Sequence, residues 1–336
     1  MDRIKVALNG FGTIGKRVAD AVRLQKDMEL IGITGHSYNF RMEAANDRGI
    51  PIYTFNGEND FKANGITPAG KVDQLFQEAD IIVDATPKKV GKDNKEKYYV
   101  PMKKKAIFQG GEKAATAEVS FVAQCNFKEA VNKNYVRVVS CNTTGLCRAL
   151  KAVDDLYGLE LVHATMVRRG ADPGDIDHGP INAIVPVLEL PSHHGPDVQT
   201  VLHNVNIFTT AMSVSTTLMH CHSIHAECKK TPDVAELVKR FKETTRIRMV
   251  RTAEQVNSTA EIIELARDMG RIRGDMPELC LWEEAVGVVG KNLFYLQAVH
   301  QESIVVPENI DAIRAAMGFT DAQKSIDTTN KSIGIR

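Results

Sequence analysis

The segment Val6-Ala-Leu-Asn-Gly-Phe-Gly-Thr-Ile-Gly15 decides the fold of the first part of the chain. It places Gly10, Gly12 and Gly15 in a G-x-G-x-x-G pattern, directly after an apolar run and at the start of a helical pattern. The first glycine permits a tight turn, the second lets a pyrophosphate approach the backbone, and the third lets helix and strand pack closely. The helix start also offers free N–H groups to phosphates. We therefore predict a dinucleotide-binding site, with a purely structural turn as the alternative.

Short apolar runs recur along the first 140 residues, as buried parallel strands require. They lie at residues 4–8, 30–33, 81–83, 106–108 and 136–139. Helical spacing fills the stretches between them, for example at Ile14, Val18 and Val22. The pattern predicts an α/β fold with a doubly wound parallel sheet of the Rossmann type, forming a dinucleotide-binding domain over residues 1–139.

The pattern changes after residue 160, where longer segments alternate between polar and apolar residues. These segments, at 160–167 and 205–227, predict an α+β catalytic domain over residues 140–304 with a mostly antiparallel sheet. Residues 170–196 are rich in Gly, Pro, Asp and His and are expected to form loops. Helical spacing returns near the end, which predicts a C-terminal segment over 305–336 that packs back on the first domain.

Composition narrows the class of protein and of partner. The 336 residues are 43% hydrophobic and carry 42 basic and 42 acidic side chains, so nucleic acid or a membrane surface is not an expected partner. The six cysteines lack the spacing of a disulfide framework, and the start resembles neither a signal nor a transit peptide. We expect a cytoplasmic globular protein that binds a small molecule or another subunit.

The end of the second apolar run bears on the choice of cofactor. A site specific for NAD usually has an acidic residue there, but the sequence continues Ile33-Thr-Gly-His-Ser-Tyr38. Thr34, His36 and Ser37, with Arg41 nearby, are able to accommodate a 2′-phosphate. We therefore expect NADP to be used at least as well as NAD. The alternative is that these are ordinary loop residues.

The segment Tyr135-Val-Arg-Val-Val-Ser-Cys-Asn-Thr-Thr-Gly145 predicts a strand that leads Cys141 to the start of a helix. Unsatisfied N–H groups and the positive end of the helix dipole would stabilise a thiolate there and lower its pKa. Cys141 is thus the best candidate nucleophile, although periodicity alone explains a small packing residue equally well. Cys147 lies further into the helix and is expected to be buried and inert.

A metal site was considered because histidines and cysteines gather near residue 220. The residues concerned are His220, Cys221, His222, His225 and Cys228, with His193 and His194 upstream. On a strand, residues 220 and 222 share a face and 225 does not, and neither C-x-x-C nor H-E-x-x-H is present. We predict no metal.

The S-C-N-T-T-G-L segment around Cys141 resembles the nucleophile motif of glyceraldehyde-3-phosphate dehydrogenases, and the archaeal-type (class II) phosphorylating branch is the more similar one. Further segments that resemble this branch follow in order along nearly the whole chain. They are N-G-F-G-T-I-G-K-R-V at the start, D-A-T-P at 84–87, F-Q-G-G-E at 108–112, M-V-R-R at 166–169, S-H-H-G-P-D-V at 192–198, T-T-L-M-H at 216–220 and H-Q-E-S-I-V-V-P-E-N at 300–309.

The resemblance implies which residues form the site. It implies cofactor contacts from Thr13, Ile14, Gly111, Arg169 and Gln301 beside the three glycines, and substrate contacts from Ser140, Asn142, His194 and Gly195. Arg168 is our candidate ligand for a phosphate group, because a guanidinium offers paired donors to phosphate oxygens; a solvated arginine pair is the alternative.

Two histidines compete for the role of catalytic base. The bacterial and eukaryotic branch uses a histidine in a T-V-H-A-type segment, which His163 in Leu161-Val-His-Ala-Thr165 superficially matches. The archaeal pattern implies the histidine that ends T-T-L-M-H, here His220, and we favour it. Val214-Ser215 stands where archaeal relatives usually have Val-Pro, and the phosphate-binding arginine of the other branch is missing from residues 211–215.

The resemblance implies NAD(P)-dependent oxidation of glyceraldehyde 3-phosphate in glycolysis or gluconeogenesis, through a Cys141 thioester that inorganic phosphate cleaves, with His220 removing the hydroxyl proton. It also implies a homotetramer. One alternative is a semialdehyde or acyl-phosphate reductase of amino-acid biosynthesis, which shares the nucleotide fold and a catalytic cysteine. A dinucleotide-binding regulator without turnover is the non-enzymatic alternative.

Overall fold

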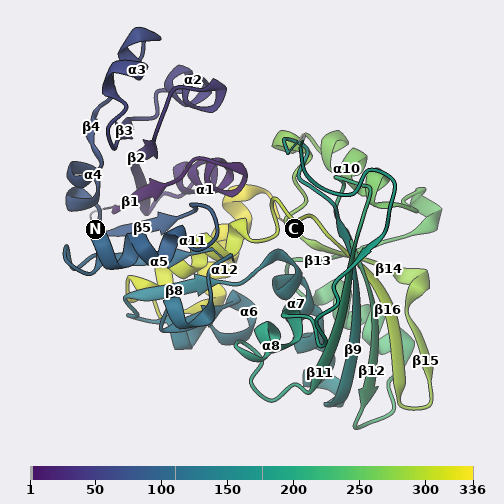
Figure 1. Cartoon of the computed structure of the whole chain (residues 1–336). Helices are drawn as coiled ribbons and strands as arrows, with labels where there is room; N and C mark the ends of the chain where they lie inside the picture. Colours follow the sequence, from purple (N-terminus) through teal and green to yellow (C-terminus); the bar gives the residue numbers. More distant parts are fainter. Residues whose placement is uncertain (1–2, 110, 176, 336) are drawn as a thin grey trace. The chain divides into compact units, whose positions relative to one another are not determined.

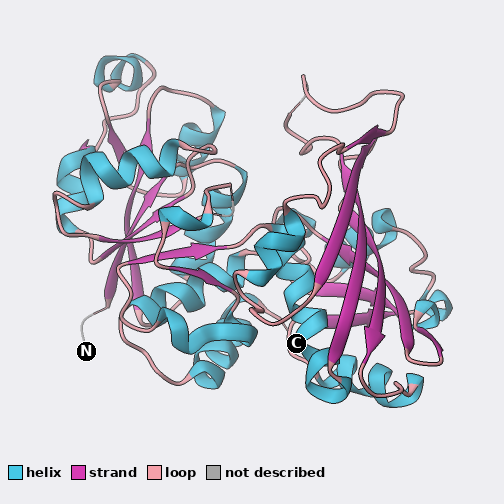
Figure 2. Ribbon diagram, turned by 60° about the horizontal axis from the view of Figure 1, so that its bottom comes forward, coloured by secondary structure: helices cyan, strands magenta, loops and turns pink. Residues whose placement is uncertain are grey.

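The computed structural model describes residues 3–109, 111–175 and 177–335 (Figures 1 and 2). The chain divides into two compact units. The first runs to Val139 and includes Val306–Gly334, and the second is Ser140–Val305 with Ile335. The divisions after Val139 and Val305 lie at or next to the domain limits expected from the sequence.

The first unit is built on one sheet in which every pair of neighbouring strands is parallel. The strand order is β4-β3-β2-β1-β5-β6-β8-β7, so the chain reverses direction across the sheet next to β1. The strands are β1 Ile4–Asn9, β2 Met28–Gly35, β3 Ile52–Thr54, β4 Gly70–Lys71, β5 Ile81–Asp84, β6 Lys105–Phe108, β7 Val119–Phe121 and β8 Tyr135–Val138. The predicted doubly wound sheet is confirmed.

The helices that pack on this sheet come from the first 139 residues and from the C-terminal segment Val306–Gly334. They are α1 Thr13–Arg23, α2 Phe40–Asp47, α3 Glu58–Ala63, α4 Val72–Glu78, α5 Val90–Asn94, a π-helical turn Lys95–Tyr99, α6 Ala123–Asn126, α11 Val306–Ala316 and α12 Ala322–Ile333, with 3-10 turns at Ala114–Thr116 and Phe127–Ala130. The C-terminal helix α11 packs against α1, β6 and β8, and α12 packs against α11. The last helices therefore complete the first unit.

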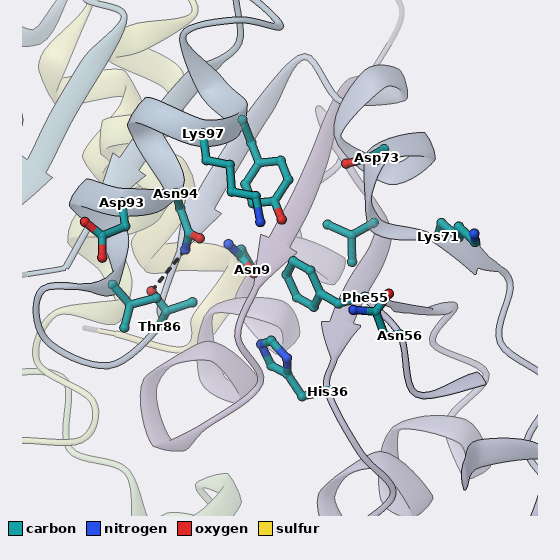
Figure 3. Close-up of a pocket in the computed structure, with 13 residues that line it drawn as sticks. Asn9, His36, Phe55, Asn56, Lys71, Asp73, Thr86, Asp93, Asn94 and Lys97 are labelled. Carbon is teal, nitrogen blue, oxygen red and sulfur yellow. Dashed lines mark hydrogen bonds between the residues drawn. The ribbon is translucent and has the colours of Figure 1, made fainter. Parts of the chain in front are cut away.

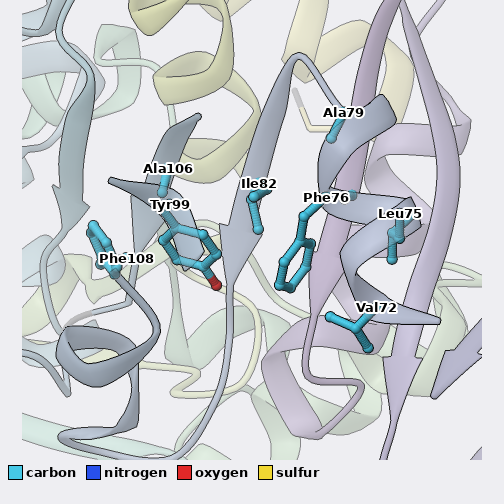
Figure 4. Packing of buried hydrophobic residues seen from close by; sticks show 9 residues of the cluster. Val72, Leu75, Phe76, Ala79, Ile82, Tyr99, Ala106 and Phe108 are labelled. Atoms are coloured by element: carbon cyan, nitrogen blue, oxygen red, sulfur yellow. The ribbon is translucent and has the colours of Figure 1, made fainter. Parts of the chain in front are cut away.

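The core of the first unit shows why its strands are apolar on both faces. Phe76 of α4 and Tyr99 of the π-helical turn are fully buried against Ala7, Ile82 and Phe108 (Figure 4). Successive residues of a strand point to opposite faces, so the neighbouring strand residues face the other helical layer. Burial on both faces explains the continuous apolar runs in the sequence.

The second unit is built on a mixed sheet in the order β10-β11-β9-β12-β16-β14-β13, with β15 paired to β16. Pairs β11/β9 and β13/β14 are parallel and the others antiparallel. The strands are β9 Leu159–Arg169, β10 Val185–Pro186, β11 Ile207–Val214, β12 His220–Cys228, β13 Ile247–Val250, β14 Leu279–Trp282, β15 Gly287–Val289 and β16 Asn292–Val299. The predicted, mostly antiparallel second sheet is confirmed.

Helix α7, Cys141–Tyr157, packs on one face of this sheet against β9, β12 and β16. Burial along β12 alternates, so His220 and His222 face α7 and His225 faces away from it. The remaining helices of the unit are α8 His194–Gln199, α9 Val234–Glu243 and α10 Thr259–Asp268, with 3-10 turns at Thr252–Glu254, Ile272–Gly274 and Glu283–Ala285. The long segment expected to be loops contains the two-residue strand β10 and the start of α8.

The expected strands of the first unit coincide with β1, β2, β5, β6 and β8 to within two residues at each end. Strands β3, β4 and β7 were missed because each has only two or three residues and shows no periodicity. Within the described residues, no helix has the length and apolar character that crossing a membrane requires.

Candidate functional site

The turn between β1 and α1 has the geometry that the three glycines predict. Gly10 has a φ of 95°, in the left-handed region that favours glycine. A Cβ on Gly15 would overlap the carbonyl oxygen of Gly10, whereas a Cβ on Gly12 would meet nothing within 4 Å. The space over Gly12 and the close approach at Gly15 fit a bound pyrophosphate and a closely packed helix, respectively.

Helix α1 begins at Thr13, and within the described residues no side chain caps its first turn by a hydrogen bond. That turn also contains no acidic residue. Its N–H groups and the positive end of the dipole therefore remain available for an anion. Thr13 and Ile14, both expected at the cofactor, lie in this turn.

A cavity of about 600 Å³ opens beside this turn, at the carboxyl ends of the parallel strands (Figure 3). The ring of His36 stacks on Phe55 with centroids 4.3 Å apart and an interplanar angle of 8°. Lys71 and Lys97 also line the cavity. Ligands of open parallel sheets bind at such a place, and this one combines flat rings with two lysines and two aspartates, Asp73 and Asp93.

Thr34, expected near the ribose, forms hydrogen bonds within the glycine turn. Its buried hydroxyl accepts a hydrogen bond from the N–H of Gly10 at 3.0 Å and donates to Asn9 Oδ1 at 2.8 Å. Asn9 in turn donates to the hydroxyl of Tyr99, which donates to the buried carboxylate of Asp84. The structure thus places Thr34 in a network that holds the glycine turn in place.

In the second unit, Cys141 is the first residue of α7, and Ser140 is its N-cap. The Ser140 hydroxyl accepts a hydrogen bond from the N–H of Thr143 at 3.3 Å and lies 2.8 Å from Thr143 Oγ1. Thr143 Oγ1 donates to Asp197 of α8. Ser140, expected to contact substrate, is therefore engaged in capping the helix.

The Cys141 Sγ lies 3.5 Å from His220 Nε2. The other ring nitrogen, Nδ1, accepts a hydrogen bond from the backbone N–H of Arg169 at 3.0 Å. An acceptor nitrogen has no proton, so the proton of the neutral ring is on Nε2 and points at sulfur. His220 thus presents a donor to Cys141, instead of the lone pair that the expected general base needs.

His220 enters β12 through an unusual backbone turn. Met219, buried at 1% exposure, has a φ of 66°. A side chain in the left-handed region costs about 1 kcal/mol, and such strain gathers at functional sites.

Burial changes the ionisation expected for Cys141. Desolvation raises the pKa of the thiol to about 11, although the Arg169 guanidinium and the backbone N–H of Asn142 act to lower it. The sequence predicted that the helix start lowers the pKa of Cys141. The backbone N–H of Asn142 does so, but desolvation raises the pKa by more. Burial likewise holds the pKa of His220 well below its usual range, with neighbouring His222 and Arg169 adding to the shift. The resting pair is a thiol beside a neutral imidazole.

Asn142 and His194, both expected at the substrate, are buried and bonded to each other. The Asn142 amide Nδ2 lies 3.2 Å from His194 Nε2, and its Oδ1 lies 2.9 Å from His222 Nε2. Gly195 is also buried, and its N–H donates to Thr209 Oγ1 at 2.9 Å. These residues surround the nucleophile from within the protein.

Arg168 and Arg169 end β9 near Cys141. The partly buried guanidinium of Arg168 has its Nη2 3.3 Å from Ser213 Oγ, and its buried Nε has no hydrogen-bond partner in the described part of the chain. Arg169 pairs with Asp172 at 2.8 Å, and Gln301 Nε2 donates to the same carboxylate at 3.2 Å. Arg168 therefore keeps a donor for an anion, while Arg169 and Gln301 share one carboxylate.

His163 and His225 do not face Cys141. His163 is exposed on the opposite face of the sheet, where it stacks on His225 with centroids 5.8 Å apart. His225 Nε2 bonds to Asn292 Oδ1 at 2.8 Å. The geometry places His220, and not His163, beside the nucleophile.

Known proteins resemble this chain over its whole length. Residues 140–272 match the model of the glyceraldehyde 3-phosphate dehydrogenase C-terminal domain. Over 338 aligned residues the chain is 50% identical to a glyceraldehyde-3-phosphate dehydrogenase of Methanococcoides burtonii, covering all of both chains. A protein of the same name from Thermococcus onnurineus is 52% identical over 99% of both. The chain belongs to the glyceraldehyde-3-phosphate dehydrogenase family.

Among solved structures, the aspartate semialdehyde dehydrogenase II of Vibrio cholerae superposes with a TM-score of 0.66 at 12% identity, covering 94% of this chain and 98% of that one. This likeness shows a shared fold. The archaeal relatives agree with the branch of the glyceraldehyde-3-phosphate dehydrogenase family that the sequence motifs indicate.

The sequence analysis missed the buried residues that form hydrogen bonds around the site. The sequence analysis considered His222 only as part of a possible metal site, and Thr209 and Gln297 were not singled out. The alternation along β12 carried one usable signal, because it places residues 220 and 222 on the same face.

Proposed function

We propose that the chain catalyses the reversible, NAD(P)-dependent phosphorylating oxidation of D-glyceraldehyde 3-phosphate to 1,3-bisphosphoglycerate, in glycolysis and gluconeogenesis, through a thioester on Cys141. One observation carries the proposal: Cys141, at the start of α7, faces His220 in a chain about half identical to enzymes of that name. A dinucleotide-binding regulator without turnover would not need this pair.

A nicotinamide dinucleotide supplies the hydride acceptor for this family's oxidation. The open space over Gly12 and the uncapped start of α1 fit its pyrophosphate. The residues proposed to hold it are Gly10, Gly12, Thr13, Ile14, Gly15, Thr34, Gly111, Arg169 and Gln301. Thr34 would act by fixing the glycine turn, as its two hydrogen bonds indicate.

We further propose that NADP is used at least as well as NAD. No acidic residue directly follows β2, and Lys71 and Lys97 offer cationic groups in a cavity that Asp73 and Asp93 also line. Lys97→Ala should lower kcat/KM for NADP more than for NAD, and Lys239→Ala, in an exposed ion pair of α9, should change neither. An equal effect of the first variant on both cofactors would contradict this preference.

The chemistry assigned to the chain's own residues begins with the thiol of Cys141. Its sulfur bonds to the aldehyde carbon and its proton passes to the carbonyl oxygen, which gives a thiohemiacetal. The Nε2–H of His220 then stabilises that oxygen as its proton leaves to solvent. Loss of hydride, for which the bound nicotinamide would be the acceptor, gives the thioester. This donor role follows from the Arg169 N–H at Nδ1 and replaces the base role expected from the sequence.

Inorganic phosphate would attack the thioester carbon, so that the C–S bond breaks and an acyl phosphate leaves. The unpartnered Nε of Arg168 is the donor we propose for a phosphate oxygen. A second cavity, of about 430 Å³, lies where β9 ends and includes the hydroxyl side chains of Ser215, Thr216 and Thr217 among its lining. Hydroxyl groups of this kind are suited to a second phosphate.

The deciding experiment is a spectrophotometric assay of the purified protein. Glyceraldehyde 3-phosphate is offered with and without inorganic phosphate, with NAD and NADP in parallel, and aspartate semialdehyde serves as the alternative substrate. We expect reduction of the nicotinamide that needs both the triose and phosphate. Equal turnover without phosphate, or preference for the semialdehyde, would overturn the assignment.

We also propose a homotetramer in the cytoplasm. Ile181 and Leu188 are 94% and 86% exposed in the segment before α8, where several other large apolar side chains are also exposed. Apolar groups gathered in this way usually meet another subunit. Light scattering should give four chains, and Leu188→Asp should lower that number. None of the six cysteines forms a disulfide in the described part of the chain, as a reducing compartment favours.

A further inference from the structure

We propose that His222 is a positioning residue for the nucleophile, acting through the side chain of Asn142 on the first turn of α7. The inference rests on the proposed function, in which Cys141 is the attacking group. It concerns a residue that does not touch Cys141 and that the mechanism above does not use.

His222 is fully buried and has a hydrogen-bond partner on each side of its ring. Nδ1 lies 2.9 Å from Gln297 Nε2 of β16, which donates to it. Nε2 therefore has the proton of the neutral ring, and it donates to Asn142 Oδ1 at 2.9 Å. The imidazole joins the middle of the sheet to the start of the helix.

The same chain of hydrogen bonds continues beyond Asn142. Its Nδ2 donates to His194 Nε2 at 3.2 Å, and His194 Nδ1 donates to Ser192 Oγ at 3.1 Å. The Ser192 hydroxyl lies 2.9 Å from Thr209 Oγ1 of β11. The first turn of α7 is thus tied to β16 and β12 on one side and to α8 and β11 on the other.

Each imidazole in the chain must be neutral, because each donates through one nitrogen and accepts through the other. Burial supports this state by lowering the pKa of both His222 and His194 to about 3. For His194, the nearby His193 and Arg168 add to the shift. Fixed donor and acceptor directions allow only one orientation of the Asn142 amide.

The orientation of Asn142 matters because this residue directly follows Cys141 in the first turn of α7. Its backbone N–H is one of the groups that lower the pKa of the thiol. A side chain held at both ends fixes the backbone that bears this N–H. Loss of the His222 contact should therefore move a donor away from sulfur without removing any group that touches the substrate.

The experiment measures the rate of Cys141 alkylation by iodoacetamide in the free enzyme, together with kcat and KM. His222→Phe keeps a flat ring but loses both hydrogen bonds, and we expect alkylation and kcat to fall about tenfold or more. The KM for the cofactor should stay unchanged. His222→Gln can place an N–H near the position of Nε2 and should recover most of the loss.

A double-mutant cycle tests whether the effect passes through Asn142. The variant with both His222→Phe and Asn142→Ala should react no more slowly than Asn142→Ala alone. Gln297→Met, which removes the donor to Nδ1, gives an independent second variant should His222→Phe fail to fold. His225→Phe is the matched control, because it makes the same change on the opposite face of β12.

An unchanged alkylation rate in His222→Phe and Gln297→Met, or effects that multiply in the double variant, would overturn the proposal. The alkylation rate needs no turnover, so it tests the positioning role even if the assay with the triose phosphate fails. A failed assay with the expected alkylation pattern would contradict the proposed function alone.

Discussion

The starts of α1 and α7 follow the same strand-turn-helix pattern, yet they differ in what surrounds their free N–H groups. At α1, Gly12 leaves open space and no described side chain caps the turn. At α7, Ser140 caps the turn and a buried network surrounds Cys141. The open start of α1 is suited to a ligand that is already negatively charged. The closed start of α7 holds Cys141, and desolvation disfavours the charged form of its side chain. Local pattern predicts where a helix begins, and desolvation decides what its start can bind.

The largest expected effect separates the two helix starts. Cys141→Ser should reduce oxidation at least about a thousandfold, because an alcohol is a far weaker nucleophile than a thiol. Cofactor binding, measured by fluorescence titration, should stay within about twofold, because α1 lies in the other unit. Turnover retained by this variant would show that the closed helix start does not hold the nucleophile.

Substitution of His220, beside the closed start of α7, should give the second largest effect. His220→Ala should lower kcat about a hundredfold, as loss of one donor to a developing negative charge does. His220→Gln, which keeps an N–H near Nε2, should lose only about tenfold. His163→Ala, on the exposed opposite face, serves as the control and should behave as the parent enzyme.

Equal losses in the two His220 variants would favour a general base, since glutamine has no proton-accepting nitrogen. Stopped-flow measurement of the first turnover distinguishes these outcomes.

The ionisation of Cys141 tests whether burial outweighs the helix start. With a pKa of about 11, the thiolate fraction should rise about tenfold for each pH unit from pH 7 to pH 9. The alkylation rate of the free enzyme should follow it with no plateau in that range. A plateau below pH 8 would mean that the closed start, like the open one, favours negative charge.

Substitutions of the two glycines at the open start should give the smallest effects. One should change cofactor affinity and the other stability. Gly12→Ser places atoms in the open space, so cofactor affinity should fall about tenfold while thermal stability is kept, because serine is a good N-cap. Gly15→Ala should cost about 2 kcal/mol of unfolding free energy, because its Cβ overlaps Gly10. Calorimetry and cofactor titration of both variants check the pair. A stable Gly15→Ala protein would show that the turn is looser than described.

The sequence predicted the parts of the molecule that local pattern controls. Apolar runs located the central parallel strands, the glycine spacing located the dinucleotide turn, and a strand followed by a helical pattern located Cys141. Motif resemblance added His220. These features depend on residues close together in the chain, where periodicity and spacing carry information.

The rest depends on contacts between residues far apart. Four elements bring together the buried side chains of Asn142, His194, His222 and Gln297. No spacing of these residues along the chain predicts that contact. The raised pKa of Cys141 follows from burial, which sequence shows only as an average. The helix-start argument for a low pKa of Cys141 therefore differs from the structure. The base role of His220 stays a prediction, beside the donor role that the Arg169 N–H favours.

The desolvation of the Cys141 sulfur has a consequence for its oxidation. Peroxides attack the thiolate and react slowly with the protonated thiol. With a pKa of about 11, Cys141 is almost entirely protonated near neutral pH. The surroundings that keep this resting thiol protonated should therefore slow its oxidation by peroxides to a sulfenic acid.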